Sequence, residues 1–138
     1  MIERSNYIVK ISKPAYVNQI FWKRVYYAKI RRNWIRGSKL VFITKMRQSE
    51  DVFVGVGKIK TIYEVSVLSA DERKICIQKN LHSKIIFDTM VRFIPAVLTC
   101  DVKFISLNRM EGPSLDGTYL SDSEISSIEG LAKIVIIS

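Results

Sequence analysis

Few side chains in the sequence have the types and spacing that catalysis or metal binding requires. The single histidine, His82, has no second histidine and no acidic residue at helical spacing, so a surface position fits it better than a metal ligand or a general base. Cys76 and Cys100 are too few and too far apart for a disulfide framework or a zinc knuckle. Cys100 is expected to fill space in the core. The sequence therefore predicts no catalytic residue, no cofactor and no metal site.

Basic and aromatic side chains, by contrast, alternate closely between Phe21 and Arg47. Lysine and arginine bind phosphates and aromatic rings stack on unpaired bases, so this mixture is typical of surfaces that bind single-stranded nucleic acid. A planar guanidinium can hold a phosphate with two hydrogen bonds, which favours the arginines of the 31–37 segment as phosphate contacts. The predicted nucleic-acid-binding residues are Trp22, Tyr27, Lys29, Arg31, Arg32, Trp34, Arg36, Lys45 and Arg47.

The positive charge is concentrated in the first third of the chain. The formal net charge is +9, and residues 1–48 hold 12 of the 22 basic residues but only one of the 13 acidic ones. Such asymmetry predicts a surface for a polyanion, because cations at phosphates release condensed counterions. Charge that serves solubility alone, or an acidic protein partner, stays an alternative. An anionic membrane surface is disfavoured, because no long amphipathic helix flanks the charges.

The length and composition predict one globular domain over residues 1–138, since domains of about 100–150 residues are the commonest and 48% of the residues are hydrophobic. Paired strands with helices at the edges are expected to close into a small barrel. Residues 68–80 are ambiguous, and we expect a turn followed by a strand there. The other strands are expected at 7–11, 25–30, 39–45, 52–67, 96–107 and 133–137, and the helices at 15–21, 81–93 (ended by Pro95) and 121–130.

The segments Lys39–Lys45 and Val52–Val67 are expected to form an antiparallel hairpin. Alternation within the second segment puts Gly55 and Gly57 on the same face of the strand. Two such glycines indicate a β-bulge or the close approach of another segment, and packing is the commoner cause. A phosphate-binding loop is disfavoured, because the spacing and the following helix of such motifs are missing.

Some of the aromatic residues must serve the core instead of a ligand. On the first predicted helix, Tyr16 and Ile20 are expected to face the core, and Trp22 is open to either role. Trp34 lies among the arginines of the 31–37 loop, where it is expected either to stack on a base or to plug the open end of the barrel.

The last predicted helix has clear boundary signals. Ser121 and Glu124 have the spacing of a capping box, and Gly130 is suited to the C-cap. A final strand is expected at Lys133–Ile137, which could pair in the sheet or with a second copy.

No segment of the sequence is suited to crossing a membrane. Apolar runs such as Ile134–Ile137 are far shorter than the roughly 20 residues that a spanning helix needs. Charged residues, among them Glu3 and Arg4, interrupt any apolar run of signal-peptide length near the N-terminus. A cytoplasmic location without a membrane partner is therefore expected.

The order of these segments resembles the PUA-like superfamily, which includes the PUA, ASCH and EVE domains. The likeness spans most of the chain and is greatest to uncharacterised archaeal members. Ile43 and Thr44 stand where EVE relatives often carry an aromatic residue. The likeness is carried by the strand near Tyr7, the helix after Pro14, the basic loop Arg31–Gly37, and the motifs GSKLVFITK (Gly37–Lys45), VFVGVGKIKTIY (Val52–Tyr63) and DGTYLSDSE (Asp116–Glu124).

The resemblance implies an α+β pseudobarrel of mixed strands with two or three short helices. It also implies a noncatalytic module that binds nucleic acid, RNA in preference to DNA, and that assists a nucleic-acid-modifying enzyme. Two alternatives stay open: an EVE-like reader of modified DNA bases, and a small ASCH-type enzyme that acts on modified nucleosides through a lysine–glutamate pair. The binding cleft is expected between the loop Arg31–Gly37 and the hairpin end at Lys45–Arg47.

Overall fold

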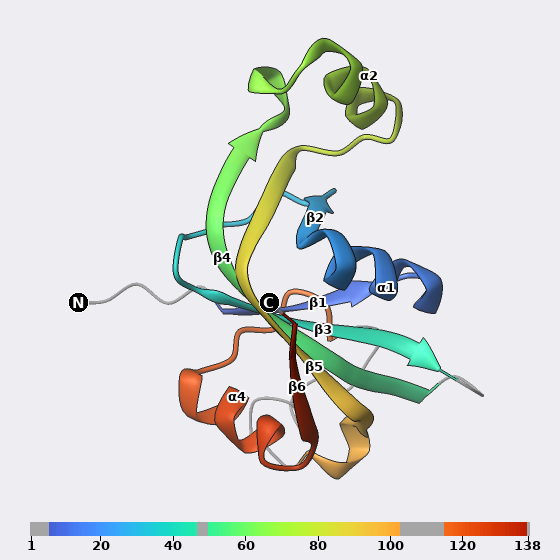
Figure 1. Ribbon diagram of the computed structural model, residues 1–138, viewed down its shortest axis with the longest axis vertical. Coiled ribbons are helices and arrows are strands. Elements are labelled where there is room, and N and C mark those ends of the chain that lie inside the picture. Colours follow the sequence, from blue (N-terminus) through green and yellow to red (C-terminus); the bar gives the residue numbers. More distant parts are fainter. Residues whose placement is uncertain (1–5, 47–49, 103–114, 138) are drawn as a thin grey trace.

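One curved sheet organises the molecule (Figure 1). The computed structural model describes residues 6–46, 50–102 and 115–137. The strands follow the order β1-β3-β4-β5-β2, and β6 also pairs with β5. β1 runs parallel to β3, and the other pairings are antiparallel. The strands are β1 (Tyr7–Ile11), β2 (Val25–Ala28), β3 (Lys39–Met46), β4 (Glu50–Glu64), β5 (Ser83–Leu98) and β6 (Lys133–Ile137).

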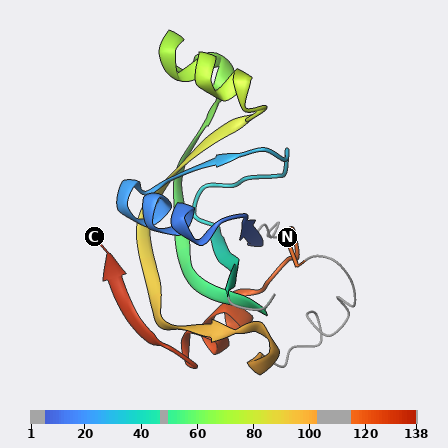
Figure 2. The ribbon, with the colours of Figure 1, turned by 90° about the vertical axis from the view of Figure 1, so that its right-hand side faces the viewer.

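Three α-helices accompany this sheet within the described residues. In Figure 2, α2 (Ala70–Gln78) lies at one end of the molecule, α4 (Asp122–Glu129) near the other end, and α1 (Pro14–Lys23) between them. Two short 3₁₀ helices, η1 (Val65–Val67) and η2 (Thr99–Asp101), follow β4 and β5. No helix in the described part of the chain is long and apolar enough to span a bilayer. The α+β pseudobarrel with short helices that the sequence predicted is confirmed.

The sheet buries apolar side chains on both of its faces. Neighbouring residues of β3 point to opposite faces, as strand geometry requires: Phe42 belongs to one core cluster and Val41 to the other. Phe21 of α1 packs into the first cluster, and Ile125 of α4 packs into the second. Each face is therefore covered by its own helix.

The predicted hairpin is confirmed, because β3 and β4 pair antiparallel from Lys39↔Lys58 to Met46↔Glu50. The strands expected at 7–11 and 133–137 are also present, and β6 pairs with β5 in the sheet. Ser121 and Glu124 form the predicted capping box, and Gly130 is the C-cap of α4.

The helix predicted over 81–93 is wrong, because these residues belong to β5. The pairing of β5 with β4 shifts register at three places, and the shift between Thr89 and Phe87 puts an interval of three between the buried residues Phe87 and Met90. Phe93 belongs to the core cluster on the face opposite to that of Met90. The buried residues Ile85, Phe87, Met90 and Phe93 thus follow intervals of two, three and three, which imitate a helical stripe. Pro95 lies inside the strand instead of ending a helix.

The turn and strand predicted over 68–80 are also wrong, because residues 70–78 form α2. Ser69 caps this helix by accepting a hydrogen bond from the Glu72 backbone N–H. The alternation of Ile75 and Ile77 with polar residues suggested a strand, but both side chains are more than half exposed. Cys76 is the residue that α2 buries.

Three smaller expectations also need correction. On α1, Val17, Ile20 and Phe21 are buried, whereas Tyr16 is 43% exposed and Trp22 is 85% exposed. Cys100 is exposed in η2 and fills no core space, because β5 has already ended at Leu98. The strand expected over 96–107 is present only as far as Leu98, where β5 ends, and residues 99–101 form η2. Residues 103–107 lie outside the described residues.

The two glycines of β4 are explained by close approach. A Cβ atom at Gly55 would lie 2.3 Å from both the Phe21 ring and the carbonyl oxygen of Val91. A Cβ atom at Gly57 would lie 2.7 Å from the ring of Phe87. Only bare backbone leaves room for the aromatic side chains that fill this face of the sheet.

We expect Gly55→Ala to lower the free energy of unfolding by about 3 kcal/mol, because the backbone oxygen beside the new methyl group cannot move aside. Gly130→Ala is the matched control, since its nearest neighbours would lie at 3.5 Å and its φ of −66° suits any residue. That change should stabilise the protein by about 0.5 kcal/mol. Urea unfolding of both variants checks the prediction, and equal stabilities would contradict the packing role of Gly55.

Candidate nucleic-acid interface

The loop between β2 and β3 carries five of the predicted binding residues: Lys29, Arg31, Arg32, Trp34 and Arg36. Its end is fixed to β4, because the Gly37 N–H donates to the Ile59 carbonyl and the Ile59 N–H donates to the Ser38 carbonyl. Gly37 has a φ of +83°, which favours glycine at this turn. The loop therefore holds its cations beside the part of β4 that extends beyond the pairing with β3.

Arg32 braces the fold and is largely buried. Its guanidinium donates to the Asp116 carboxylate at 2.9 Å and lies over the rings of Tyr7 and Trp34, 5.9 Å from each ring centre. Asp116 also accepts a hydrogen bond from the backbone N–H of Lys10. Gly117 has a φ of +84°, which favours glycine there, and it lies next to the Arg32 guanidinium. Arg32 thus ties the loop to β1 and to the segment before α4.

Trp34 is part of the same packed cluster. Its ring meets Tyr7 edge-on, with 5.7 Å between centres and 82° between planes. Its indole N–H is buried and has no hydrogen-bond partner among the described residues. These contacts show that the Trp34 ring packs against the fold.

Tyr26 lies close to this cluster and packs against Phe42. Its pKa is raised to about 12, chiefly by burial and next by the negative charge of Asp116, while Arg32 acts in the opposite direction. Tyr26 therefore keeps its hydroxyl proton at neutral pH.

The exposed cations of the loop have weaker partners. Arg31 lies 3.6 Å from Glu64, and both side chains are mostly exposed, so solvent screens the pair. Arg36 donates to the hydroxyl of Thr61 on β4. Lys29 is exposed at the end of β2. These three side chains can reach a ligand without breaking a buried contact.

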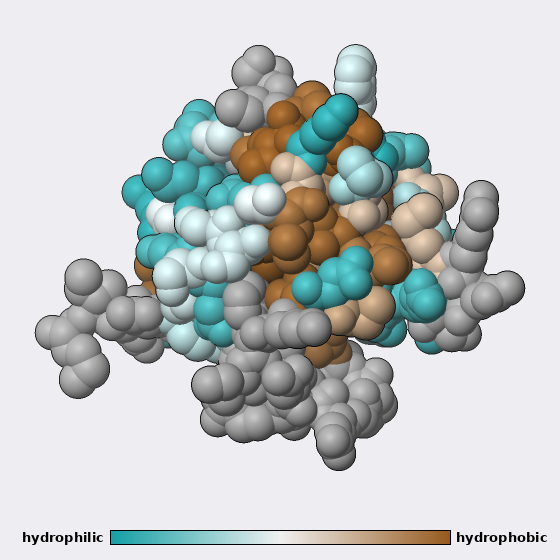
Figure 3. Space-filling view, turned by 90° about the horizontal axis from the view of Figure 1, so that it is seen from below, coloured by the Kyte–Doolittle hydropathy of each residue, from teal (hydrophilic) through white to brown (hydrophobic). Residues whose placement is uncertain are grey.

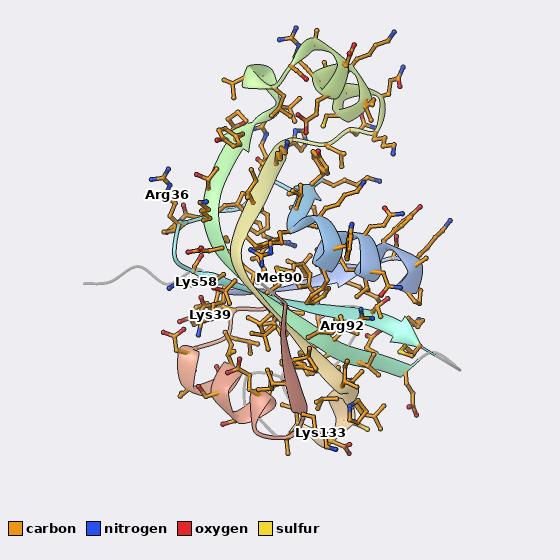
Figure 4. All side chains as sticks on the ribbon, viewed as in Figure 1. Arg36, Lys39, Lys58, Met90, Arg92 and Lys133 are labelled. Carbon is orange, nitrogen blue, oxygen red and sulfur yellow. The ribbon has the colours of Figure 1, made fainter. Side chains whose placement is uncertain are left out.

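The register of the hairpin adds two lysines that were not among the predicted binding residues; Lys39 lies in the basic and aromatic stretch, and Lys58 lies outside it. Lys39 of β3 lies directly opposite Lys58 of β4, and like charges in such positions repel. Neither lysine forms an ion pair with an acidic side chain of the described residues. Figure 4 shows both on the same side of the molecule as Arg36. We call Arg36, Lys39, Lys58 and the exposed Lys60 the basic strip.

The other predicted residues lie away from this strip. Lys45 is exposed near the far end of β3, about 20 Å from Lys39 at the usual rise per strand residue, so one narrow cleft does not join the loop to the hairpin end. Arg47 lies outside the described residues. Trp22 projects from α1 with 85% of its surface exposed. Tyr27 is half-buried and contacts α2.

Tyr27, Glu72 and Lys84 form a polar anchor between β2, α2 and β5. The Tyr27 hydroxyl donates to Glu72, and the Lys84 ammonium lies 2.6 Å from the same carboxylate. The hydrogen bond from Lys84, followed by that from Tyr27, lowers the pKa of Glu72. Burial, followed by the hydrogen bond to Glu72, raises the pKa of Tyr27.

The described residues form no metal-binding cluster but expose some apolar surface. Within the three described ranges, no group of three His, Cys, Asp or Glu side chains could hold a metal ion. Viewed from below, an apolar area lies beside and among hydrophilic side chains (Figure 3). The exposed apolar side chains near β6 and the end of β5 are Ile94, Leu131, Ile134 and Val135.

No protein-family model matches the sequence, and no curated protein is significantly similar to it. Solved structures do share its architecture. The ASCH protein from Zymomonas mobilis superposes with a TM-score of 0.64 at 11% identity, covering 95% of this chain and 98% of that one. The chain has the PUA-like fold. The YTH domain of the Zygosaccharomyces rouxii MRB1 protein, solved in complex with N6-methyladenosine RNA, has a TM-score of 0.58 at 18% identity, covering 95% of this chain and 85% of that one.

Two neighbouring arginines of this PUA-like fold should differ sharply in their effect on stability. Arg32→Gln should lower the free energy of unfolding by about 2 kcal/mol, because it leaves Asp116 without its charged partner. Arg31→Gln should cost less than about 1 kcal/mol, because its pair with Glu64 is exposed. Urea unfolding measures both, and an equal loss in the two variants would contradict the bracing role of Arg32.

The polar anchor should make the stability of the PUA-like fold depend on pH. Because the folded state lowers the pKa of Glu72 below its ordinary value of 4.5, the stabilisation is complete above that pH and is lost as the pH falls through the folded pKa. Glu72→Gln should therefore lower the urea midpoint at pH 7, with a difference from the parent that shrinks below pH 4.5. Asp71→Asn removes a neighbouring exposed carboxylate and is the control. A difference that stays constant with pH would rule out this linkage.

Proposed function

We propose that this chain is a noncatalytic nucleic-acid-binding module that holds the phosphate backbone of RNA on its basic strip. The observation that carries the proposal is the register of the hairpin, which places Lys39 opposite Lys58. Two like charges in direct cross-strand positions destabilise a sheet, and an anion between them removes the repulsion. Arg36 and Lys60 lie beside this pair and extend the positive surface along β4.

The fold comparison supports RNA as the polyanion. The YTH domain of similar fold is complexed with a modified RNA. Single-stranded RNA is commonly held by cations on its backbone together with aromatic rings on its bases. Trp22 is a ring of this kind, with 85% of its surface exposed, but it lies away from the basic strip, so a strand must continue past α1 to stack on it.

A small enzyme acting on modified nucleosides has less support. The lysine–glutamate pair that it would need is present in Lys84 and Glu72, but both groups hold Tyr27 and α2 in place. The lowered pKa of Glu72 makes this carboxylate a weak proton acceptor at neutral pH. The pair therefore fits a structural anchor better than a general base.

The test is fluorescence anisotropy with labelled single-stranded RNA, duplex RNA and duplex DNA at several salt concentrations. The variant Lys39→Gln/Lys58→Gln should weaken the binding of single-stranded RNA of any sequence. Its plot of log affinity against log salt should be less steep by about 1.4, because each lost phosphate contact on a single strand removes about 0.7.

The control is Lys74→Gln/Lys133→Gln, which removes the same charge from exposed positions on α2 and β6. Figure 4 shows Lys133 well away from the basic strip. This control should retain nearly the affinity of the parent. An equal loss in both double variants would show that only the net charge matters. Tighter binding to duplex DNA than to either RNA would favour the reader of modified DNA bases.

A further inference from the structure

A pocket of about 400 Å³ lies between α2, η1 and the loop that follows β2. Its walls include two arginines from different elements, Arg31 of the loop and Arg73 of α2. His82, the one histidine of the sequence, lines the same pocket. The volume falls within the range of about 300–1,000 Å³ that is usual for sites of small molecules.

The two guanidinium groups of this pocket are only loosely engaged. Arg31 lies 3.6 Å from Glu64, in a pair whose side chains are mostly exposed. Arg73 donates to the backbone carbonyl of Ser66 at 3.4 Å. A guanidinium has five N–H donors, so each arginine keeps most of its donors for a ligand. The pocket can therefore hold an anionic group between two cations.

The remaining walls suit a planar, partly apolar body. Ile77 of α2, which is 62% exposed, and Leu81 both line the pocket and give it an apolar wall. Glu64 adds a carboxylate that can accept hydrogen bonds from hydroxyl groups, as acidic residues do at ribose sites. An anion, a hydroxylated sugar and a base are the three parts of a ribonucleotide.

The pocket also lies at one end of the basic strip. Thr61, which accepts the hydrogen bond of Arg36, is three residues from Glu64 on β4. Arg31 and Arg36 belong to the same loop. A strand whose phosphates follow the basic strip along β4 is therefore led towards the pocket.

We infer that this pocket binds a single ribonucleotide of an RNA strand. The phosphate lies between Arg31 and Arg73, the ribose hydroxyls are held by Glu64, and the base rests on Ile77. This inference rests on the proposed function, because it assigns one nucleotide of the bound RNA to a defined place.

The experiment is isothermal titration of the whole chain with nucleoside 5′-monophosphates and 3′-monophosphates, the free nucleosides and inorganic phosphate. Monophosphates should bind more tightly than either nucleosides or phosphate alone, and the better isomer identifies the phosphate that the arginines hold. Arg73→Gln should weaken this binding about tenfold, because a charged hydrogen bond is lost. Lys74→Gln, the neighbouring residue on α2, should leave it unchanged.

Two further variants keep the outcome decisive if Arg73→Gln disturbs α2. Arg31→Gln alters an exposed loop residue and should weaken monophosphates to a similar degree. Ile77→Ser should weaken monophosphates and leave inorganic phosphate unaffected, because it removes only the contact to the base. Equal binding of phosphate and monophosphates, or no binding of any compound, would overturn the inference.

Failure of this inference can be told from failure of the proposed function. The variant Lys39→Gln/Lys58→Gln should bind monophosphates as the parent does, because neither lysine lines the pocket. If monophosphates do not bind but single-stranded RNA still depends on the lysine pair, the pocket assignment is wrong and the basic strip stands. If neither binds, both proposals are wrong.

Discussion

The structure depends on the bare backbone in the middle of β4. Gly55 leaves room for the ring of Phe21, and Gly57 leaves room for that of Phe87, so α1 can lie directly on the sheet. The C-cap residue of α1 is Arg24, whose backbone carbonyl accepts the N–H of Phe87. This bond brings the start of β2 to β5, and the loop after β2 then reaches the edge of β4. The position of the basic loop is therefore a consequence of packing against two glycines.

The charged side chains divide into those that hold the fold and those that are left for a ligand. Arg32 and Lys84 each engage a carboxylate within 3 Å, and both are mostly buried. Lys39 and Lys58 face each other instead, with no ion pair to an acid in the described ranges. If these lysines served solubility alone, staggered positions would make the sheet more stable, since directly opposed lysines repel. An anionic ligand between the two lysines, as proposed above, would remove this repulsion.

Sequence patterns were sufficient wherever local chemistry decided the structure. The hairpin and the capping box at Ser121 were confirmed, because alternation and capping depend on neighbouring residues. Sequence patterns failed for β5, where a register shift interrupts the alternation of buried residues. They also failed for α2, which buries little more than Cys76. The lysine pair could not be predicted either, because its register depends on the hairpin turn and on a bulge after Phe42. Partners such as Arg32 and Asp116, 84 residues apart, meet only in the folded chain.

Helix α2 stands apart from both core clusters and is held chiefly by polar contacts. It buries Cys76, while Ile75 and Ile77 remain exposed, so its burial of apolar surface contributes little to its position. The Glu72 carboxylate accepts hydrogen bonds from Tyr27 of β2 and Lys84 of β5, and these bonds attach α2 to the sheet. Segments with few buried apolar contacts open at a lower free energy than the core does. A ligand that contacts both α2 and the basic loop would therefore stabilise α2 in its observed position, since anything that binds one state shifts the equilibrium towards it. Because α2 belongs to neither core cluster, it carries one wall of the pocket without being part of the packing that holds the sheet.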